Sequence, residues 1–189
     1  MTAIVVNLIG APSVGKSTTA AKLFGELKAM SLNAEYSPEV AKLWVYEHKK
    51  INKYGQYVLF GEEVRQQSRL FNEVDIVISD SSPILAAFYN YYYNKENSLS
   101  EACHGFYKKV EEDGIKVINF FLPRKKKYVA KGRYQTQEQA DEVATLLREW
   151  LDKEGYSFIE LDCPYKERIN VVLEKLKEIT GDFDGMALG

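Results

Sequence analysis

The chain has 189 residues, of which 46% are hydrophobic and 28% charged, the ordinary balance of a globular protein with one domain. This composition excludes a fibre, a collagen-like chain and a disordered tail. A net charge of −2 excludes a protein coated in positive charge for nucleic acid, while leaving room for a local basic patch.

The apolar pattern switches repeatedly between the periods of strands and helices, which is typical of a parallel sheet with helices on its faces. Residues 3–9 are apolar except for Asn7, as expected for a strand buried on both sides. In chain order the predicted elements are a strand over 3–9, a helix over 17–30, a strand over 33–36, helices over 38–48 and 56–71, a strand over 74–79, helices over 83–93 and 99–113, a strand over 116–122, a helix over 136–154, a strand over 156–161 and a helix over 165–179.

The turn after the first strand carries the most specific motif. The phosphate-binding pattern G-x-x-x-x-G-K-[ST] is matched in full by Gly10-Ala11-Pro12-Ser13-Val14-Gly15-Lys16-Ser17. The two glycines allow turns that a Cβ would hinder, and successive N–H groups at a helix N-terminus make a nest for phosphate oxygens. We predict that Lys16 bridges the terminal phosphates of a nucleoside triphosphate, that Ser17 coordinates Mg²⁺ and that Thr18 binds the α-phosphate.

Two acidic residues follow predicted strands on the side where ligands collect in a parallel sheet. Asp80 comes directly after the strand 74–79, and could hold Mg²⁺ through water or accept the proton of an acceptor hydroxyl; its alternative role is to cap the next helix. Glu39 follows the second strand and could orient or deprotonate the acceptor. A plain electrostatic role in the first turn of a helix is its alternative.

Arg65 and Arg69 lie four residues apart on the predicted helix 56–71 and share a face. Together they could bind a phosphate or carboxylate of the substrate, and surface pairing with Glu62 or Glu73 is the equal alternative. Four tyrosines are too crowded in sequence to lie on one face, so some are expected in the core and one could stack on a base: Tyr89, Tyr91, Tyr92 and Tyr93.

Positive charge gathers after the strand 116–122, with six lysines and arginines between Arg124 and Arg133. A lid over about 123–136 that carries an arginine would close on the triphosphate, neutralise the transferred phosphoryl group and exclude water. Arg133, beside Gly132, is the candidate catalytic arginine. A solvated loop and a foothold for a nucleic-acid backbone are the alternatives.

Four segments occur in a recognisable order: the phosphate-binding loop, Glu39-Val40-Ala41-Lys42, residues 74–83 and Gly132-Arg133-Tyr134-Gln135-Thr136. Over residues 4–165 the chain resembles the P-loop kinase family that includes the NadR-like nicotinamide riboside kinase domain, and particularly its short bacteriophage members. Some of those phosphorylate 5-hydroxymethyluracil within DNA. The resemblance implies that Lys16 and Ser17 bind phosphate and Mg²⁺, that Asp80 lies near the acceptor or the metal, and that Arg133 belongs to the lid.

We therefore expect an α/β fold of the P-loop NTPase type, a three-layer sandwich with a mostly parallel five-stranded sheet and a lid. One kinase domain is expected over 1–180 and a flexible tail over 181–189. The expected activity is Mg²⁺-ATP-dependent phosphotransfer to a hydroxyl of a nucleoside-type acceptor, such as 5-hydroxymethyluracil in phage DNA. A free nucleoside or nucleoside monophosphate is the alternative acceptor, and a regulatory ATPase without a phosphorylated product is the alternative of another class.

The remaining residues favour a cytoplasmic setting, in the host cytoplasm if a phage encodes the chain. No apolar run is long enough to cross a bilayer, and residues 1–10 lack the pattern of a secretory signal. Cys103 and Cys163 indicate neither a disulfide framework nor a close metal pair. The Mg²⁺ that accompanies the nucleotide is the one metal expected, and the oligomeric state and the choice between ATP and GTP stay open.

Overall fold

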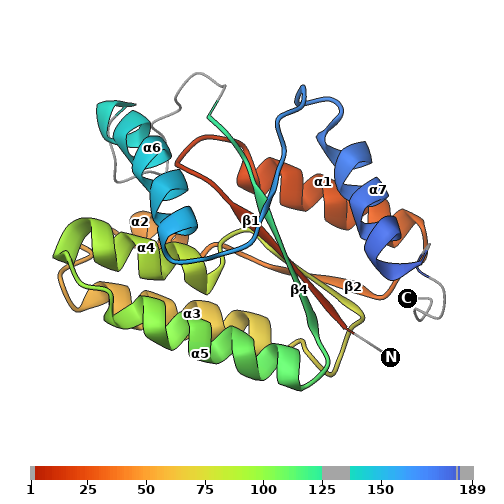
Figure 1. The fold of residues 1–189 in the computed structure, drawn as a ribbon, viewed down its shortest axis with the longest axis horizontal. Helices are drawn as coiled ribbons and strands as arrows, with labels where there is room; N and C mark the ends of the chain where they lie inside the picture. The colour runs from red at the N-terminus through yellow and green to blue at the C-terminus, as the bar shows by residue number, and fades with distance from the viewer. Residues whose placement is uncertain (1–2, 125–136, 182, 184–189) are drawn as a thin grey trace.

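The computed structural model describes residues 3–124, 137–181 and 183. Their elements, in chain order, are β1 (Ile4–Ile9), α1 (Lys16–Ala29), β2 (Ala34–Ser37), α2 (Val40–Tyr46), α3 (Gly55–Ser68), β3 (Ile76–Ser79), α4 (Pro83–Asn94), α5 (Ser98–Glu112), β4 (Lys116–Phe121), α6 (Gln137–Lys153), β5 (Ile159–Glu160) and α7 (Arg168–Thr180) (Figure 1).

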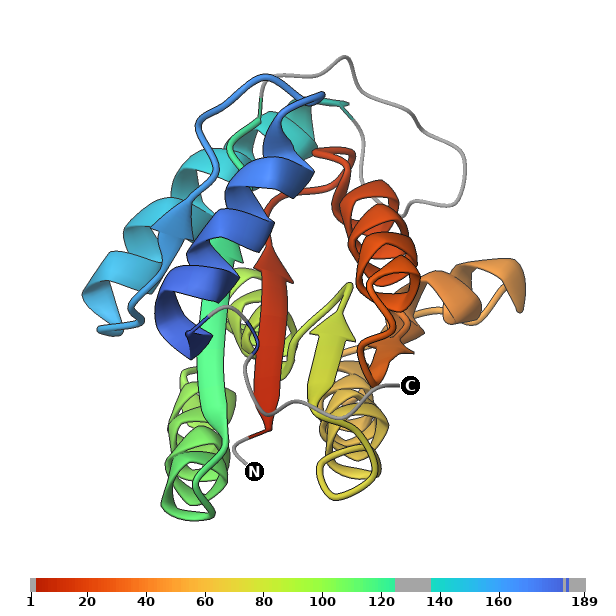
Figure 2. The same cartoon turned by 90° about the vertical axis from the view of Figure 1, so that its right-hand side faces the viewer.

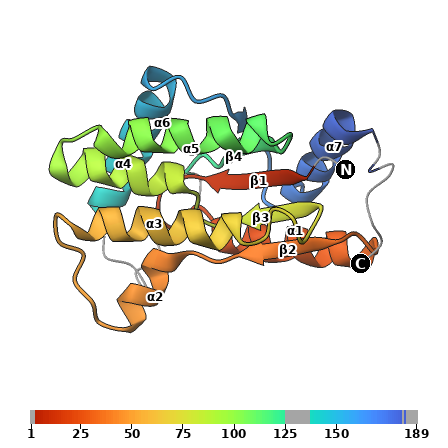
Figure 3. The same ribbon diagram turned by 90° about the horizontal axis from the view of Figure 1, so that it is seen from below.

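The five strands form one sheet in the order β2-β3-β1-β4-β5, and every pairing is parallel. β1 lies in the centre and is buried along its whole length, which explains why all its residues except Asn7 are apolar. Helices α1 and α7 pack together on one face of the sheet, with β1 visible between them in Figure 2. Helices α3, α4 and α5 pack against one another on the other side (Figure 3). This arrangement confirms the expected α/β fold class.

Each predicted element is present, and the two that are shortened most, α2 and β5, each lose four residues. β5 has two residues because it pairs with β4 only at Phe120 and Phe121. Before it, the N–H of Tyr156 still bonds the carbonyl of Leu151 at the end of α6. α2 begins at Val40 rather than residue 38, since Glu39 is extended, with φ −67° and ψ 115°.

Alternate residues of β1 face two different apolar clusters. Ile4, Val6 and Leu8 belong to the larger core. Val5 belongs to a smaller cluster with Val110 near the end of α5. The two-residue period of a strand therefore gives the central strand a core on each face.

Five polar side chains form a hydrogen-bonded network at the sheet, and all but the half-buried Asn119 are buried. The Nδ2 of Asn7 donates to the Tyr107 hydroxyl at 3.1 Å and to Asn119 Oδ1 at 2.9 Å. The Nε2 of Gln67 donates to Asn7 Oδ1 and to Ser79 Oγ, both at 2.9 Å. The Tyr107 hydroxyl in turn donates to Gln67 Oε1 at 3.3 Å. The network joins β1, β3 and β4 to α3 and α5, and its buried polar groups satisfy one another.

Across residues 3–124 and 137–181, no helix combines the length and the apolar character that crossing a bilayer requires.

Candidate active site

The phosphate-binding loop leaves β1 at Gly10 and enters α1 at Lys16. Gly15 has φ +97°, a left-handed conformation that favours glycine. Gly10 is required for a different reason, which is space. A Cβ there would lie 2.8 Å from the Leu122 carbonyl oxygen and 2.9 Å from Val14 Cγ2. Of the two glycines in the motif, Gly15 allows a left-handed backbone conformation, and Gly10 allows the loop to lie close to Leu122, the residue after β4.

Three cationic side chains donate to carbonyl groups of this loop. Lys16 Nζ lies 2.9 Å from the oxygen of Gly10 and 3.3 Å from that of Ala11. Arg124 Nη1 donates to Pro12 at 3.0 Å, and Arg168 Nη1 donates to Val14 at 2.8 Å. Because the N–H and C=O of one peptide unit point in opposite directions, carbonyls held in this way direct the neighbouring N–H groups to the other side, as an anion nest requires.

The arginines connect the loop to the two last helices. Arg124 also pairs with Asp141 of α6. Arg168 is the first residue of α7, only 2% exposed, with its guanidinium 5.8 Å from the centre of the Tyr165 ring. Burial lowers the pKa of Arg168 below its ordinary value. Sequence analysis missed Arg168, because its partner Val14 lies far away in the chain.

Asp80 follows β3, as predicted, and is 2% exposed. Its Oδ2 accepts a hydrogen bond from the Tyr36 hydroxyl at 3.0 Å, and its backbone N–H donates to Ser37 at 3.0 Å. Its Oδ1 is buried and has no hydrogen-bond partner among the described residues. Burial and the nearby carboxylate of Asp80 raise the pKa of Tyr36, so the phenol stays protonated and donates.

Glu63, in the middle of α3, is a buried carboxyl that sequence analysis missed. Its Oε1 accepts a hydrogen bond from the backbone N–H of Val40 at 3.0 Å. Its Oε2 is buried and has no partner in the described part of the chain. Burial, with smaller contributions from Glu39 and Asp80, raises the pKa of Glu63 well above its usual range. Its neighbours Glu62 and Arg65 suggested an ordinary charged helix face, and only the tertiary structure shows that Glu63 points inward.

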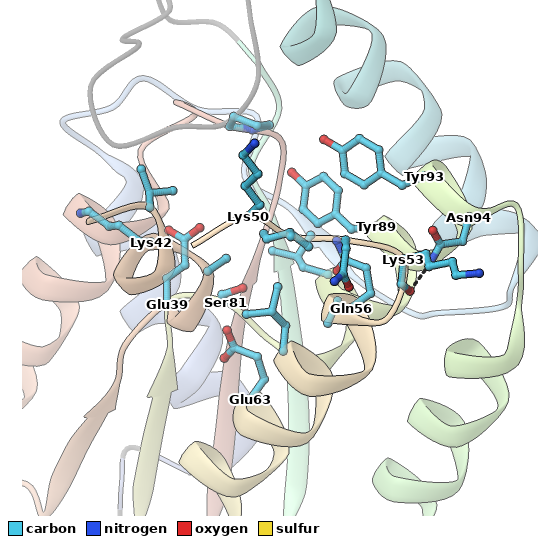
Figure 4. Close-up of a pocket in the computed structure, with 18 of the residues that line it drawn as sticks. Glu39, Lys42, Lys50, Lys53, Gln56, Glu63, Ser81, Tyr89, Tyr93 and Asn94 are labelled. Carbon is cyan, nitrogen blue, oxygen red and sulfur yellow. Dashed lines mark hydrogen bonds between the residues drawn. The ribbon is translucent and has the colours of Figure 1, made fainter. Parts of the chain in front are cut away.

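A cavity of about 460 Å³ lies between the phosphate-binding loop, α2, α3 and α4, a volume that suits a small-molecule ligand. Lys16 from the loop and the carboxyl groups of Glu39 and Glu63 line it, with Ser81 close to them (Figure 4). Asp80 is not among the lining residues. The cavity thus brings together the predicted residues Lys16 and Glu39 and adds Glu63, while Ser81, the residue next to Asp80, also lines it.

The tyrosines of α4 divide between the cavity and the core. Tyr89 and Tyr93 line the cavity, and their rings stack with centres 5.9 Å apart and planes 17° apart (Figure 4). Tyr92 stacks on Phe88, and Tyr91 stacks on a tryptophan of α6. Two of the four tyrosines therefore line the cavity, and the other two pack against the core.

The two arginines predicted to bind substrate lie elsewhere. Arg65 donates to Glu62 at 3.0 and 3.1 Å on the surface, and Arg69 is also exposed. Neither lines the cavity. The inward face of α3 carries Gly55, Gln56, Leu59, Glu63 and Gln67, and the arginines lie on the opposite side of the helix, where the alternative of surface pairing holds for Arg65.

The structure leaves two sets of predicted roles untested. Arg133 and most of the expected lid lie outside the described residues. Ser17 is half-buried and Thr18 exposed in the first turn of α1, and their roles toward Mg²⁺ and phosphate stay predictions. Among the residues that the structure describes, no group of three or more His, Cys, Asp or Glu side chains forms a ready metal site.

Comparisons with known proteins agree with this architecture. The sequence profile of a protein family described as an AAA domain matches residues 5–168. A structure of NadR protein in complex with NR is 20% identical, with a TM-score of 0.69 over 95% of this chain and 52% of that chain. This chain therefore spans about half the length of NadR. No curated protein sequence matches.

Two complete kinases share the fold at low identity. Deoxyadenosine kinase from M. mycoides with bound dATP is 17% identical, with a TM-score of 0.60 over 94% of this chain and 100% of that one. Shikimate kinase from Acinetobacter baumannii in complex with shikimate is 14% identical, with a TM-score of 0.57 over 96% and 95% of the two chains. At these identities the likeness is one of fold.

Proposed function

This chain belongs to the AAA domain family, and from that premise we propose that it is a Mg²⁺-ATP-dependent phosphotransferase with a nucleoside-type hydroxyl as acceptor. The observation that carries the proposal is the shared cavity. Lys16 of the phosphate-binding loop, Glu39 and Glu63 all line it. A donor phosphate and an acceptor hydroxyl could therefore meet in one cavity, which is what phosphoryl transfer requires.

The loop residues fit a triphosphate and its metal. Gly15 gives the loop its left-handed turn into α1, and Lys16 can exchange its carbonyl partners for phosphate oxygens. Ser17, together with the unpartnered buried oxygen of Asp80, offers oxygen donors of the kind that Mg²⁺ prefers, directly or through water. When bound, the ion would neutralise charge on the phosphates.

In the proposed reaction Glu39 is the general base. As the acceptor oxygen bonds to the γ-phosphorus, the bond between that phosphorus and the bridging oxygen of ADP breaks, and the hydroxyl proton passes to the Glu39 carboxylate. We choose Glu39 over Asp80 because Glu39 lines the cavity, while Asp80 is not among the lining residues and has one oxygen bonded to the Tyr36 hydroxyl. Glu63, whose raised pKa favours the protonated form, would donate a hydrogen bond that orients the acceptor.

A nucleoside-type acceptor is supported by the stacked Tyr89 and Tyr93 rings and by the fold neighbours, which include deoxyadenosine kinase solved with dCMP. On the resemblance to phage kinases, we propose 5-hydroxymethyluracil within DNA as the specific acceptor. A free nucleoside or nucleoside monophosphate is the other candidate.

The test is transfer from γ-labelled ATP to a panel of nucleosides, nucleoside monophosphates, plain DNA and DNA containing 5-hydroxymethyluracil, with and without Mg²⁺. We expect Mg²⁺-dependent label on one acceptor class. Glu39→Gln should abolish transfer and keep ATP affinity. The control is Glu47→Gln, because Glu47 is exposed and follows α2 at its other end; this variant should behave like the wild type. A protein that binds ATP and labels no acceptor would refute the proposal.

A further inference from the structure

Two glutamines on the inward face of α3 have different surroundings. Gln56, in the first turn, is 3% exposed, and Gln67, in the last turn, is fully buried. Gln67 uses both ends of its amide in the polar network at the sheet, donating from Nε2 and accepting at Oε1. No hydrogen bond joins the Gln56 amide to another residue that the structure describes. Since buried amides in proteins are almost always paired, Gln56 requires an explanation that Gln67 does not.

Gln56 is one of three amide side chains that line the cavity of the candidate active site (Figure 4). The other two already bind backbone groups. Asn52 Oδ1 accepts hydrogen bonds from two backbone N–H groups at the start of α3, both at 3.0 Å. Asn94 Nδ2 donates to the carbonyl of Lys53 at 2.9 Å. Of these three amides, Gln56 is therefore the one whose donor and acceptor are left for a ligand.

The backbone that carries Gln56 is held in place. A Cβ on Gly55 would lie 3.1 Å from a side-chain carbon of Ile51 and 3.5 Å from the ring of Trp44, so the first turn of α3 packs closely against its surroundings. The hydrogen bonds to Asn52 fix the same turn. An amide on a fixed helical backbone can select among ligands, because it presents its donor and acceptor in one arrangement.

The inward face of α3 connects Gln56 to the site of the proposed reaction. Gln56 and Glu63 are seven residues apart on this face, which places them about 10 Å apart along the helix axis. Leu59 lies between them and lines the same cavity, and Tyr89 and Tyr93 line it from α4. An acceptor that reacts beside Glu63 would therefore extend along an apolar wall, and its far edge would meet the Gln56 amide.

Resting on the proposed function, we infer that Gln56 determines which acceptor is used, by selecting a ring whose edge carries a hydrogen-bond donor next to an acceptor. A glutamine amide offers both kinds of group side by side, so it can form two parallel hydrogen bonds with such an edge, as amide side chains do with bases. Uracil, with its N3–H beside a carbonyl, and adenine, with its amino group beside N1, both qualify. A ring without this pair would leave the buried amide unpaired, and the site would reject it.

The experiment measures binding and phosphotransfer for nucleosides paired so that only this edge differs: 5-hydroxymethyl-2′-deoxyuridine with its 3-methyl derivative, and adenosine with N6,N6-dimethyladenosine. The wild type should bind at least one parent nucleoside about tenfold to a hundredfold more tightly than its methylated partner. In Gln56→Leu the parent should lose this advantage, with a raised KM and a kcat that changes little. The matched control Gln66→Leu makes the same change at a half-buried glutamine of α3 outside the cavity, and it should keep the wild-type preference.

Thermal melting separates this role from a structural one. Gln56→Leu should be at least as stable as the wild type, because the substitution breaks no hydrogen bond to a described residue. Gln56→Glu keeps the size of the side chain and replaces the donor by an acceptor, so it should also lose the preference. A marked loss of stability in Gln56→Leu, with an unchanged preference in Gln56→Glu, would show that the amide is structural.

Calorimetry with magnesium ATP separates this inference from the proposed function. A protein that prefers a parent nucleoside but neither binds ATP nor transfers phosphate would refute the phosphotransferase alone. Wild-type protein that binds ATP and none of the four nucleosides would overturn the inference. So would equal binding of both members of each pair, or a Gln56→Leu variant that keeps the wild-type preference.

Discussion

Gly10 offers a sharp test of how the phosphate-binding loop is built. In Gly10→Ala the new Cβ would lie 2.8 Å from the Leu122 carbonyl oxygen, whereas ordinary contacts begin near 3.4 Å. The oxygen is backbone, and the N–H of Leu122 is itself bonded to Ile9 at 2.8 Å, so no flexible side chain can move aside. Overpacking of this kind costs about 1–3 kcal/mol. In a domain of this size that lowers the melting temperature by about 2–4 °C per kcal/mol.

The same substitution should also weaken the binding of ATP. A shift of the loop that costs about 1.4 kcal/mol of phosphate binding weakens ATP about tenfold, measurable by calorimetry. Gly25→Ala is the matched control. Gly25 lies inside α1 with nothing within 4 Å of the added Cβ, so that variant should be more stable by about 0.5–1 kcal/mol and bind ATP normally. Equal melting temperatures and ATP affinities for Gly10→Ala and the wild type would refute the reasoning.

Three further predictions concern charged residues. The pKa of Glu63 is raised in the folded chain, so above about pH 4.3 the Glu63 carboxyl ionises in the unfolded chain and stays protonated in the folded one. The free energy of unfolding therefore falls by about 1.4 kcal/mol per pH unit until the folded pKa is reached. Glu63→Gln should flatten this decline in melting temperatures recorded against pH, and an unchanged profile would contradict the reasoning. Arg168→Met leaves the buried Val14 carbonyl without its donor and should cost about 1–3 kcal/mol in urea unfolding; a midpoint equal to the wild type's would count against that role. Lys16→Ala and Arg133→Ala should both lose phosphotransfer, but calorimetry should show lost ATP affinity only for Lys16→Ala, and equal losses would contradict the predicted lid role of Arg133.

The fold was predictable because its signals are local. The apolar run of β1 and the stripe of α1 each lie within about a dozen residues, and the loop between them carries a complete motif. The two-residue β5 was overestimated because its length depends on where β4 stops offering partners, at Phe120 and Phe121. That limit is set by tertiary pairing, which the sequence of the strand does not contain.

The site was predictable only in the part that lies next to the motif. Lys16 and Glu39 come shortly after β1 and β2, so they lie at the edge of the sheet where its parallel strands end. Glu63 bonds a backbone group 23 residues away, and Arg168 one that is 154 residues away. Judged by residue type alone, Arg65 is the more obvious ligand for an anionic substrate, yet it lies on the outer face of α3 while Glu63 lies on the inner face. Such roles follow from how helices pack and leave no periodic trace in the sequence.

The buried polar network has a consequence for the alignment of the reacting groups. Asn7 stands directly beside Ser79 on one neighbouring strand and Asn119 on the other. The other strand residues are mostly valine and isoleucine, so sliding a strand by two positions would exchange one apolar side chain for another at little cost. The same slide would leave several buried amides and hydroxyls without partners, at about 1–3 kcal/mol each. This single hydrophilic layer therefore fixes the register of the strands. The fixed register in turn sets the position of the start of the phosphate-binding loop after β1 relative to the carboxyl group of Asp80 after β3.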